Sequence, residues 1–257
     1  MDVLRNLLQG VDAGDTCVLA TVAGVRGSAP RKDAARMLVS ARGPTCGTVG
    51  GGEVEAAALA AASEMLAGPD RGRLLEIATN CGGVVTVMLE KFAPQRRLLV
   101  VGAGHVGQAV AAAGSRAGYR VTVASPGGSE RALDIAECES VAADDPAVLN
   151  RWENAERTQV VVATGDADAD AAWAVAALAR PFAGVGVVGS RNKAAAIRHA
   201  AAAAGVPPDR AYTLRCPVGL DLGAVTPEEI AVSIVAELIR LDRTGEVPEG
   251  WRRASQG

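Results

Sequence analysis

The sequence predicts an α/β protein in which a small α+β domain precedes a Rossmann-like domain with a doubly wound parallel sheet. Two observations predict the second domain. A short apolar run at residues 98–101 leads into the spacing G-x-G-x-x-G at Gly102–Gly107, and a helix-periodic stretch follows it. From there on, strand-like runs alternate with helical ones, a pattern that is typical of a parallel sheet.

Length and composition agree with this architecture. The 257 residues suffice for two small domains, and 49% apolar residues with only 3% aromatic ones predict a core of Ala, Val and Leu. The net charge is −3 without a long basic block, which argues against nucleic-acid partners. No uncharged apolar run reaches the ~20 residues that span a bilayer, and the first residues lack a signal-peptide pattern. We therefore expect a soluble cytoplasmic protein without a membrane partner.

The first part of the chain, residues 1–94, is predicted to be the small α+β domain. Apolar residues on one face indicate a short helix at Met1–Gln9, which Gly10 is expected to end. Four strands are expected at residues 17–25, 35–40, 73–78 and 84–89, and an Ala-rich helix at 54–66. A short linker with a proline, Ala93–Arg96, sets the boundary to the second domain, residues 95–257.

Two turns of the first domain are candidates for chemistry. Three glycines precede its second helix: Gly50, Gly51 and Gly52. They either present backbone N–H groups to an anion or form only a flexible turn, and the sequence favours neither interpretation. Cys81 lies between Asn80 and two glycines, in a turn where a thiol is accessible, and Cys46 beside another glycine is a second candidate.

The cysteine pattern excludes two classes of protein. Five cysteines without CxxC or zinc-finger spacing indicate neither a disulfide framework nor a metal site. Cys17, Cys138 and Cys216 lie in or beside apolar runs and are expected to be buried as small hydrophobic residues. A reduced cytosolic setting fits this pattern best.

The second domain is predicted as an alternation of strands and helices. Strands are expected at residues 98–101, 119–124, 159–163, 184–188 and near 212–214. Helices are expected between Gly104 and Gly118 and at residues 144–154, 169–179 and 191–204. The last helix is well signalled: Thr226 is its N-cap, Pro227 its first residue and Glu229 completes a capping box, and it is expected to run to about Asp242.

Helix starts that follow strands are the candidate binding sites of this domain, because a helix N-terminus presents free N–H groups and a positive dipole end to an anion. The first site contains Gly102, Gly104, His105 and Gly107. The second contains Ser190, Arg191 and Lys193, whose cations either hold an anion or form a solvated face. A third loop contains Asp166 and Asp168, which either line the site or only cap a helix. Gly104→Val is expected to cost about 1–3 kcal/mol in strain or lost binding.

The acidic residue that normally binds the ribose of NAD is missing. At the end of the second strand, where NAD-binding proteins carry Asp or Glu, this chain has Ser125. We favour the interpretation that no NAD is bound and that the glycine turn only packs a helix against the sheet. The alternative is an NADP site in which Ser125, Ser129 and Arg131 hold the 2′-phosphate.

Motifs from both domains together resemble the XdhC/CoxI family. Those of the first domain are GSAPR at 27–31, ARMLV at 35–39, GTVGGGEVE at 47–55 and NCGG at 80–83. Those of the second domain are GAGHVG at 102–107, GVVGSRNK at 186–193 and CPVGLDLGAVTPEEIAVSIVAE at 216–237. Glu53 after the last glycine resembles the XdhC branch, since the CoxI-like branch commonly has a Cys there. The chain departs from the family at Ser125, where members often have an acidic residue, and at Thr164–Asp166, where they often have Thr-His-Asp.

The resemblance implies an accessory protein for xanthine dehydrogenase or a related molybdenum hydroxylase. It implies a non-enzymatic maturation factor that binds molybdenum cofactor, protects it while a cysteine desulfurase installs its sulfur, and inserts it into the apo-hydroxylase. The phosphate of molybdopterin would be held by the glycine turns and by Arg31, Arg191 or Lys193, in a cleft between the two domains. Cys81 would be the thiol that faces the cofactor.

Two rival functions remain at this stage. An NAD(P)-dependent oxidoreductase rests on the glycine motif alone, and a partner-binding protein would leave the Rossmann cleft empty. The sequence leaves open which form of the cofactor is bound and whether a second copy of the chain is a partner in a homodimer.

Overall fold

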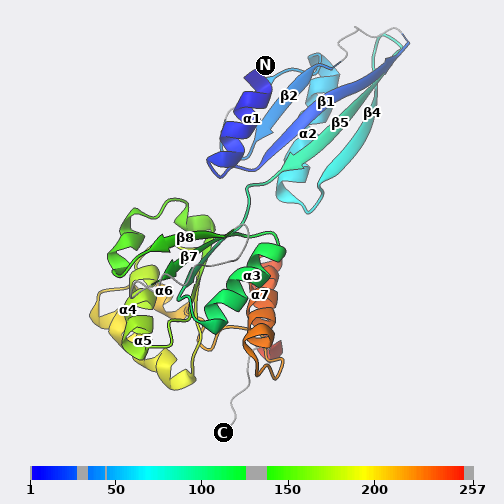
Figure 1. Cartoon of the computed structure of the whole chain (residues 1–257). Coiled ribbons are helices and arrows are strands. Elements are labelled where there is room, and N and C mark those ends of the chain that lie inside the picture. Colours follow the sequence, from blue (N-terminus) through cyan, green and yellow to red (C-terminus); the bar gives the residue numbers. More distant parts are fainter. Residues whose placement is uncertain (1, 28–33, 44, 126–137, 252–257) are drawn as a thin grey trace. The chain divides into compact units, whose positions relative to one another are not determined.

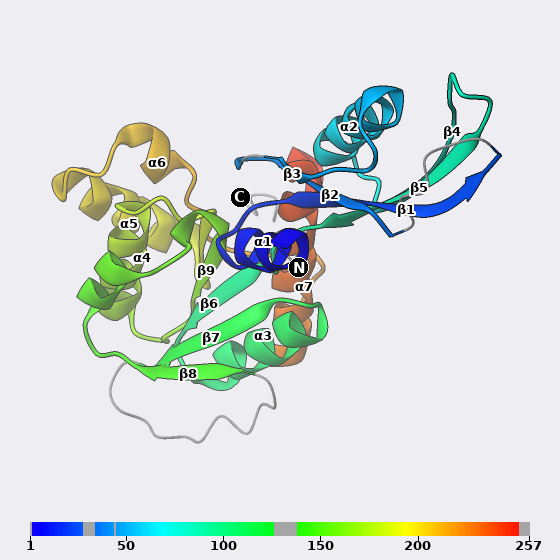
Figure 2. The ribbon, with the colours of Figure 1, turned by 90° about the horizontal axis from the view of Figure 1, so that it is seen from above.

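The computed structural model describes residues 2–27, 34–43, 45–125 and 138–251. The chain divides into two compact units, Met1–Pro94 and Gln95–Gly257. Figure 1 labels elements of both units, and Figure 2 also labels β3 (Cys46–Gly47), β6 (Arg97–Val101) and β9 (Thr158–Val162).

The N-terminal unit is a five-stranded antiparallel sheet with one helix on each face, as Figures 1 and 2 show. The strand order is β3-β2-β1-β5-β4. The elements are α1 (Asp2–Asp12), β1 (Cys17–Arg26), β2 (Arg36–Ser40), β3 (Cys46–Gly47), α2 (Gly52–Ala67), β4 (Gly72–Ala78) and β5 (Val84–Phe92).

The alternating direction of the side chains along β1 explains how the sheet packs against a helix on each face. Successive side chains of a strand point to opposite faces. Val18, Ala20 and Val22 are buried in the core that α2 covers, whereas Cys17 and Leu19 are buried in the smaller core under α1. Both faces of β1 are therefore apolar, and β1 is the central strand of the sheet.

The C-terminal unit is a five-stranded parallel sheet with the strand order β10-β9-β6-β7-β8. Its strands are β6 (Arg97–Val101), β7 (Arg120–Ser125), β8 (Glu139–Ala142), β9 (Thr158–Val162) and β10 (Gly184–Val187). Its helices are α3 (His105–Arg116), η1 (Pro146–Arg151), η2 (Ala155–Arg157), α4 (Ala167–Leu178), α5 (Arg191–Ala203), α6 (Pro208–Tyr212), α7 (Pro227–Thr244) and η3 (Glu249–Trp251).

The sheet of the C-terminal unit has the strand order of a Rossmann fold and is covered on both faces. Helices α3 and α7 pack side by side on one face, and α4 and α5 pack on the other (Figure 1). The chain reverses direction across the sheet between β6 and β9, and ligands of such sheets bind at the carboxyl ends of the strands beside this switch point. The predicted doubly wound sheet is confirmed.

Three local predictions are wrong. Helix α1 continues through Gly10, where a Cβ would lie 3.1 Å from the Cys17 Sγ, so this glycine fits the close packing of α1 on β1 rather than a helix stop. The helix expected at 144–154 is replaced by two short 3-10 helices, η1 and η2. The strand expected near 212–214 is also wrong, since α6 ends there and only Arg215 pairs with the sheet, through a bridge to Gly186.

A buried ion pair ties α7 to the sheet. The Arg215 guanidinium donates to Glu237 Oε1 at 2.7 Å and to Gln159 Oε1 at 2.9 Å, and Glu237 Oε2 accepts from the Gly219 N–H at 2.6 Å. The side chains of Arg215 and Glu237 are only 9% and 3% exposed. Because these groups are bonded to one another and shielded from water, the pair fixes both α7 and the segment that precedes it.

We expect Glu237→Gln to lower the free energy of unfolding of the C-terminal unit by about 3–5 kcal/mol, because Arg215 would remain buried without a counter-charge. The matched control is Glu139→Gln, which breaks the exposed pair with Arg120 and is expected to cost less than about 1 kcal/mol. Urea unfolding followed by tryptophan fluorescence measures both, since the three tryptophans, Trp152, Trp173 and Trp251, all lie in this unit. Equal losses for the two variants would contradict the prediction.

Candidate functional site

Three helices of the C-terminal unit begin at the carboxyl ends of its strands, and they differ in how their first N–H groups are satisfied. Asp166 caps α4, accepting from the Ala169 N–H at 2.8 Å, and Ser190 caps α5, accepting from the Lys193 N–H at 3.3 Å. The N-cap of α3 is Gly104, which has no side chain to offer. Within the described part of the chain, only the start of α3 among these three therefore has no N-cap side chain and leaves its N–H groups to an external anion.

The three glycines of the G-x-G-x-x-G turn have different roles. Gly102 has φ +114°, and a Cβ there would overlap the Ala163 carbonyl. A Cβ at Gly107 would overlap the Gly102 carbonyl oxygen, so this glycine lets α3 approach the turn. Gly104 has φ −70°, and a Cβ there would have no neighbouring atom within 4 Å, which leaves open space in front of the helix.

This geometry corrects one expectation about Gly104. Because its φ is negative and its surroundings are open, a side chain here meets no backbone strain or steric conflict among the described residues. Part of the predicted cost of Gly104→Val therefore remains without strain, because Val is a poorer N-cap than Gly, and any further loss would come from a ligand that approaches the turn.

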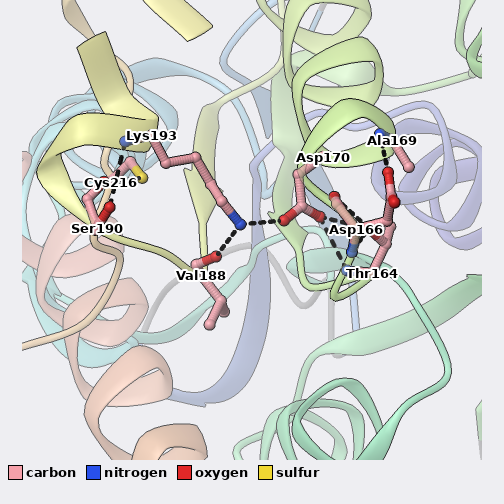
Figure 3. Close-up of polar contacts among 8 residues, drawn as sticks. All are labelled: Thr164, Asp166, Ala169, Asp170, Val188, Ser190, Lys193 and Cys216. Carbon is pink, nitrogen blue, oxygen red and sulfur yellow. Dashed lines mark hydrogen bonds and ion pairs between the residues drawn. The ribbon is translucent and has the colours of Figure 1, made fainter. Parts of the chain in front are cut away.

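Lys193 at the start of α5 forms an ion pair with Asp170 at the start of α4. Its Nζ lies 2.6 Å from Asp170 Oδ2 and donates to the Val188 carbonyl at 3.4 Å, as Figure 3 shows. Asp170 Oδ1 accepts from both the N–H and the hydroxyl of Thr164, at 3.0 and 2.6 Å. The Asp170 side chain is 1% exposed, and it joins the start of α4 to the start of α5 through Lys193 and to the loop after β9 through Thr164.

The second predicted anion site is thus partly occupied by the chain itself. The Ser190 hydroxyl caps α5 and the Lys193 ammonium neutralises Asp170, so the interpretation of Lys193 as a solvated cation is wrong. Arg191 is the first residue of α5 and is exposed. A role of these three residues in anion binding stays a prediction. Asp170 was not among the predicted site residues, because a single Asp on a helix carries no signal of its distant partner.

Cys216 lies beside this cluster. Its thiol donates to the Ser190 carbonyl at 3.3 Å (Figure 3). Burial raises the pKa of Cys216 to about 11, although Lys193 and Arg198 lower it in part. The thiol therefore stays protonated near neutral pH and acts as a hydrogen-bond donor rather than as a nucleophile.

The motifs of the N-terminal unit meet at one end of its sheet. The Glu53 carboxylate in the first turn of α2 accepts from the Asn80 N–H at 2.7 Å, which holds the turn of Cys81 beside the start of α2. A Cβ at Gly27 would lie 3.1 Å from the Gly82 carbonyl, so the end of β1 approaches the same turn. This role of Glu53 was not predicted from the sequence.

The three glycines before α2 form a second uncapped helix start. Gly50, Gly51 and Gly52 all have positive φ, and no atom lies within 4 Å of a Cβ at any of them. Gly51 is the N-cap and makes no side-chain hydrogen bond. However, the first turn of α2 carries Glu53 and Glu55, whereas the first turn of α3 has no acidic residue. An anion is therefore better accommodated at α3 than at α2.

The remaining candidates are placed as follows. Cys81 is exposed, Cys46 and Cys138 are half-buried, and Cys17 and Cys216 are buried, so the expected accessibility of Cys81 is confirmed. His105 is the first residue of α3 and is exposed. Arg31, Ser129 and Arg131 lie outside the described residues. Within the described ranges, no three His, Cys, Asp or Glu side chains form a group that could hold a metal ion, and no helix is long and apolar enough to cross a membrane.

Comparison with known families shows to which family the chain belongs. The sequence profile of the XdhC Rossmann domain matches residues 98–238, which is more than half of the chain, and that of the XdhC and CoxI family matches residues 11–77. The chain belongs to the XdhC and CoxI family. The predicted resemblance is confirmed in both units.

Two relatives of this XdhC family member come from Escherichia coli strain K12. The uncharacterized protein YqeB is 31% identical over 239 residues, which cover 87% of this chain and 43% of YqeB. The molybdenum cofactor insertion chaperone PaoD is 37% identical over 107 residues, which cover 38% of this chain and 34% of PaoD. The chain thus spans less than half the length of each of these curated relatives.

A solved structure from Bacillus halodurans shares the fold. This protein, described as a xanthine dehydrogenase, superimposes with a TM-score of 0.52 over 96% of this chain and 98% of its own, at 21% identity. At that identity the likeness supports the architecture of the XdhC family member alone.

We expect the glycines of the turn to separate folding from binding. Gly107→Ala should lower the free energy of unfolding of the C-terminal unit by about 1–3 kcal/mol, because its methyl group overlaps the Gly102 carbonyl. Gly104→Ser should be neutral or stabilising by about a few tenths of a kcal/mol, since a serine at this position caps α3. Urea unfolding measures both free energies. A destabilised Gly104→Ser variant would show that the Cβ position of residue 104 is not open.

The cysteines should differ widely in reactivity. Near neutral pH, iodoacetamide is expected to alkylate Cys81 first and Cys17 and Cys216 last, because the Cys81 thiol is exposed whereas burial shields the other two thiols and raises their pKa. Peptide mass spectrometry over a time course measures the order. In urea the difference should disappear; modification of Cys216 as fast as Cys81 in the folded protein would contradict the prediction.

Proposed function

We propose that this protein is a maturation factor that binds molybdenum cofactor and delivers it to a molybdenum hydroxylase such as xanthine dehydrogenase. Its membership of the XdhC and CoxI family and its 37% identity with the molybdenum cofactor insertion chaperone PaoD over 107 residues support the proposal. The cofactor, molybdopterin with its metal, is a ligand to be passed on rather than a resident group.

The observation that carries the proposal is the uncapped start of α3. Molybdopterin bears a phosphate, and a phosphate fits a helix N-terminus whose N–H groups are free and whose first turn is without acidic residues. The open space at Gly104 admits such a group, while Gly102 and Gly107 keep the turn in its shape. Of the sequence-predicted anion ligands, Gly102, Gly104, His105 and Gly107 thus remain the first choice.

We assign the exposed thiol of Cys81 to the same process. A cofactor whose terminal sulfur is installed by a cysteine desulfurase has an oxidisable metal centre, and an exposed thiol has the chemistry to protect such a centre. Cys81 is the most exposed of the five cysteines, and the contact between Glu53 and Asn80 holds its turn in place. The role of Cys81, the desulfurase and the identity of the hydroxylase are parts of the proposal.

The decisive variant is Gly104→Asp. A carboxylate at this N-cap supplies the missing cap of α3, so the free energy of unfolding should stay equal or rise by about a few tenths of a kcal/mol. The same carboxylate occupies and repels the phosphate position, and we expect cofactor affinity to fall by at least about tenfold, the loss of one charge-assisted contact. Fluorescence quenching titrations with molybdenum cofactor and, separately, with NADPH measure the affinities.

The matched control is Gly250→Asp, which adds the same charge at an exposed glycine with no atom within 4 Å of its Cβ. It should leave both affinities unchanged. Cofactor binding that is unaffected by Gly104→Asp would remove α3 as the site. Tight binding of NADPH alone, abolished by Gly104→Asp, would replace the proposal by the oxidoreductase alternative.

A further variant tests the thiol. Cys81→Ser should leave the urea midpoint unchanged and reduce activation of an apo-hydroxylase by about tenfold or more, because the side chain is exposed and its loss removes only its chemistry. Cys138→Ser, at a half-buried thiol, is the control and should activate normally. Full activation by Cys81→Ser would exclude the assigned role.

A further inference from the structure

The outer side of α7 carries two exposed apolar residues among charged ones, although the helix already buries its other side. Ala231, Ile234 and Leu238 lie in the core beneath the helix, beside α3. Val232 and Ile239, which are 57% and 38% exposed, lie on the opposite side. They are seven residues apart, so they are aligned along one side of the helix, two turns from each other.

Charged residues extend this row at both ends. Glu228 precedes Val232 by four residues, and Arg243 follows Ile239 by four residues; both are exposed. Neither takes part in an ion pair among the described residues. The small residue Ala236 lies between the two apolar ones. We call these five residues the α7 stripe: Glu228, Val232, Ala236, Ile239 and Arg243.

The α7 stripe is complementary to itself. Along the helix it runs acidic, apolar, small, apolar, basic, and in the opposite direction it runs basic, apolar, small, apolar, acidic. A two-fold axis relates the same patch on two subunits and makes each residue contact the mirrored position. An antiparallel pair of α7 helices therefore brings Val232 against Ile239 of the second copy and Glu228 against Arg243 of the second copy, each contact occurring twice.

We propose that the α7 stripe is the interface of a homodimer in which two copies of this chain pair their α7 helices antiparallel. The central Ala236 permits close approach of the two helices. The stripe spans ~22 Å of helix, at 1.5 Å per residue. A single helix face of this length buries less than the ~800 Å² per partner of a standard interface, so the dimer is reversible and concentration-dependent. This inference does not depend on the proposed function.

Sedimentation equilibrium of the full chain over a ~1–200 μM range tests the proposal, since a small interface gives micromolar association. Val232→Glu places an acidic side chain against Ile239 of the second copy and should weaken dimerisation by at least about tenfold without unfolding, because the Val232 side chain is exposed in the single chain. The control is Leu74→Glu, which changes a 67% exposed leucine of β4 in the N-terminal unit. This variant should dimerise as strongly as the unmodified chain, the parent.

Exchanging the charges at positions 228 and 243 tests whether these two residues pair across the interface or whether a substitution only alters the surface of the helix. Glu228→Arg and Arg243→Glu each place like charges opposite one another twice, and each should weaken the dimer several-fold. The double variant restores opposite charges and should regain the parental association constant. A parent that is monomeric throughout the concentration range overturns the proposal and leaves the stripe to a different protein. A dimer that is insensitive to Val232→Glu, or a double variant weaker than both single ones, also overturns it.

Discussion

The N–H groups in the first turn of a helix have no hydrogen-bond partner within the helix and need an acceptor from elsewhere. The helices of this protein differ in which group supplies that acceptor. Asp166 and Ser190 supply it for α4 and α5, and the Thr226 capping box supplies it for α7. At the starts of α2 and α3 the N-cap is a glycine, so no N-cap side chain supplies it. Each of these two helix starts lies within a motif that resembles the XdhC/CoxI family, GTVGGGEVE at 47–55 and GAGHVG at 102–107.

The two uncapped starts are electrostatically unlike. Glu53 and Glu55 make the first turn of α2 acidic, whereas α3 begins with His105 and no acidic residue. Glu53 is also bound to the turn of Cys81 through the Asn80 N–H. The start of α2 is therefore acidic and bound to the turn that contains Cys81, whereas the start of α3 carries no acidic residue and suits an anion better.

The predictions from sequence succeeded where a local pattern carried the information. The spacing at Gly102–Gly107 and the capping box at Thr226 each fix a turn and a helix through contacts within a few residues, and both are found. The end of α1 was misplaced because Gly10 is explained by Cys17, a residue of another element. Strands β3 and β8, of two and four residues, are too short for a periodic pattern.

In the candidate site, too, local features were predicted from the sequence and contacts between distant residues were not. Gly104 was predicted as a ligand-facing residue, but only its neighbours in space reveal that its Cβ position is open while that of Gly107 is not. Lys193 was recognised as a cation at a helix start, yet its counter-charge Asp170 lies 23 residues away on α4. The identity of such a partner depends on the fold, since the two positions are brought together only when β9 and β10 pair.

The contact between Asp170 and Lys193 has an evolutionary consequence. Loss of either partner leaves the other as an unpaired, largely buried charge, which costs several kcal/mol, whereas replacing both by apolar residues of similar size can be tolerated. Among the descendants of this chain, positions 170 and 193 are therefore expected to change together or not at all. The segment after β9 and the start of α5, although separate in sequence, are therefore expected to evolve under a shared constraint.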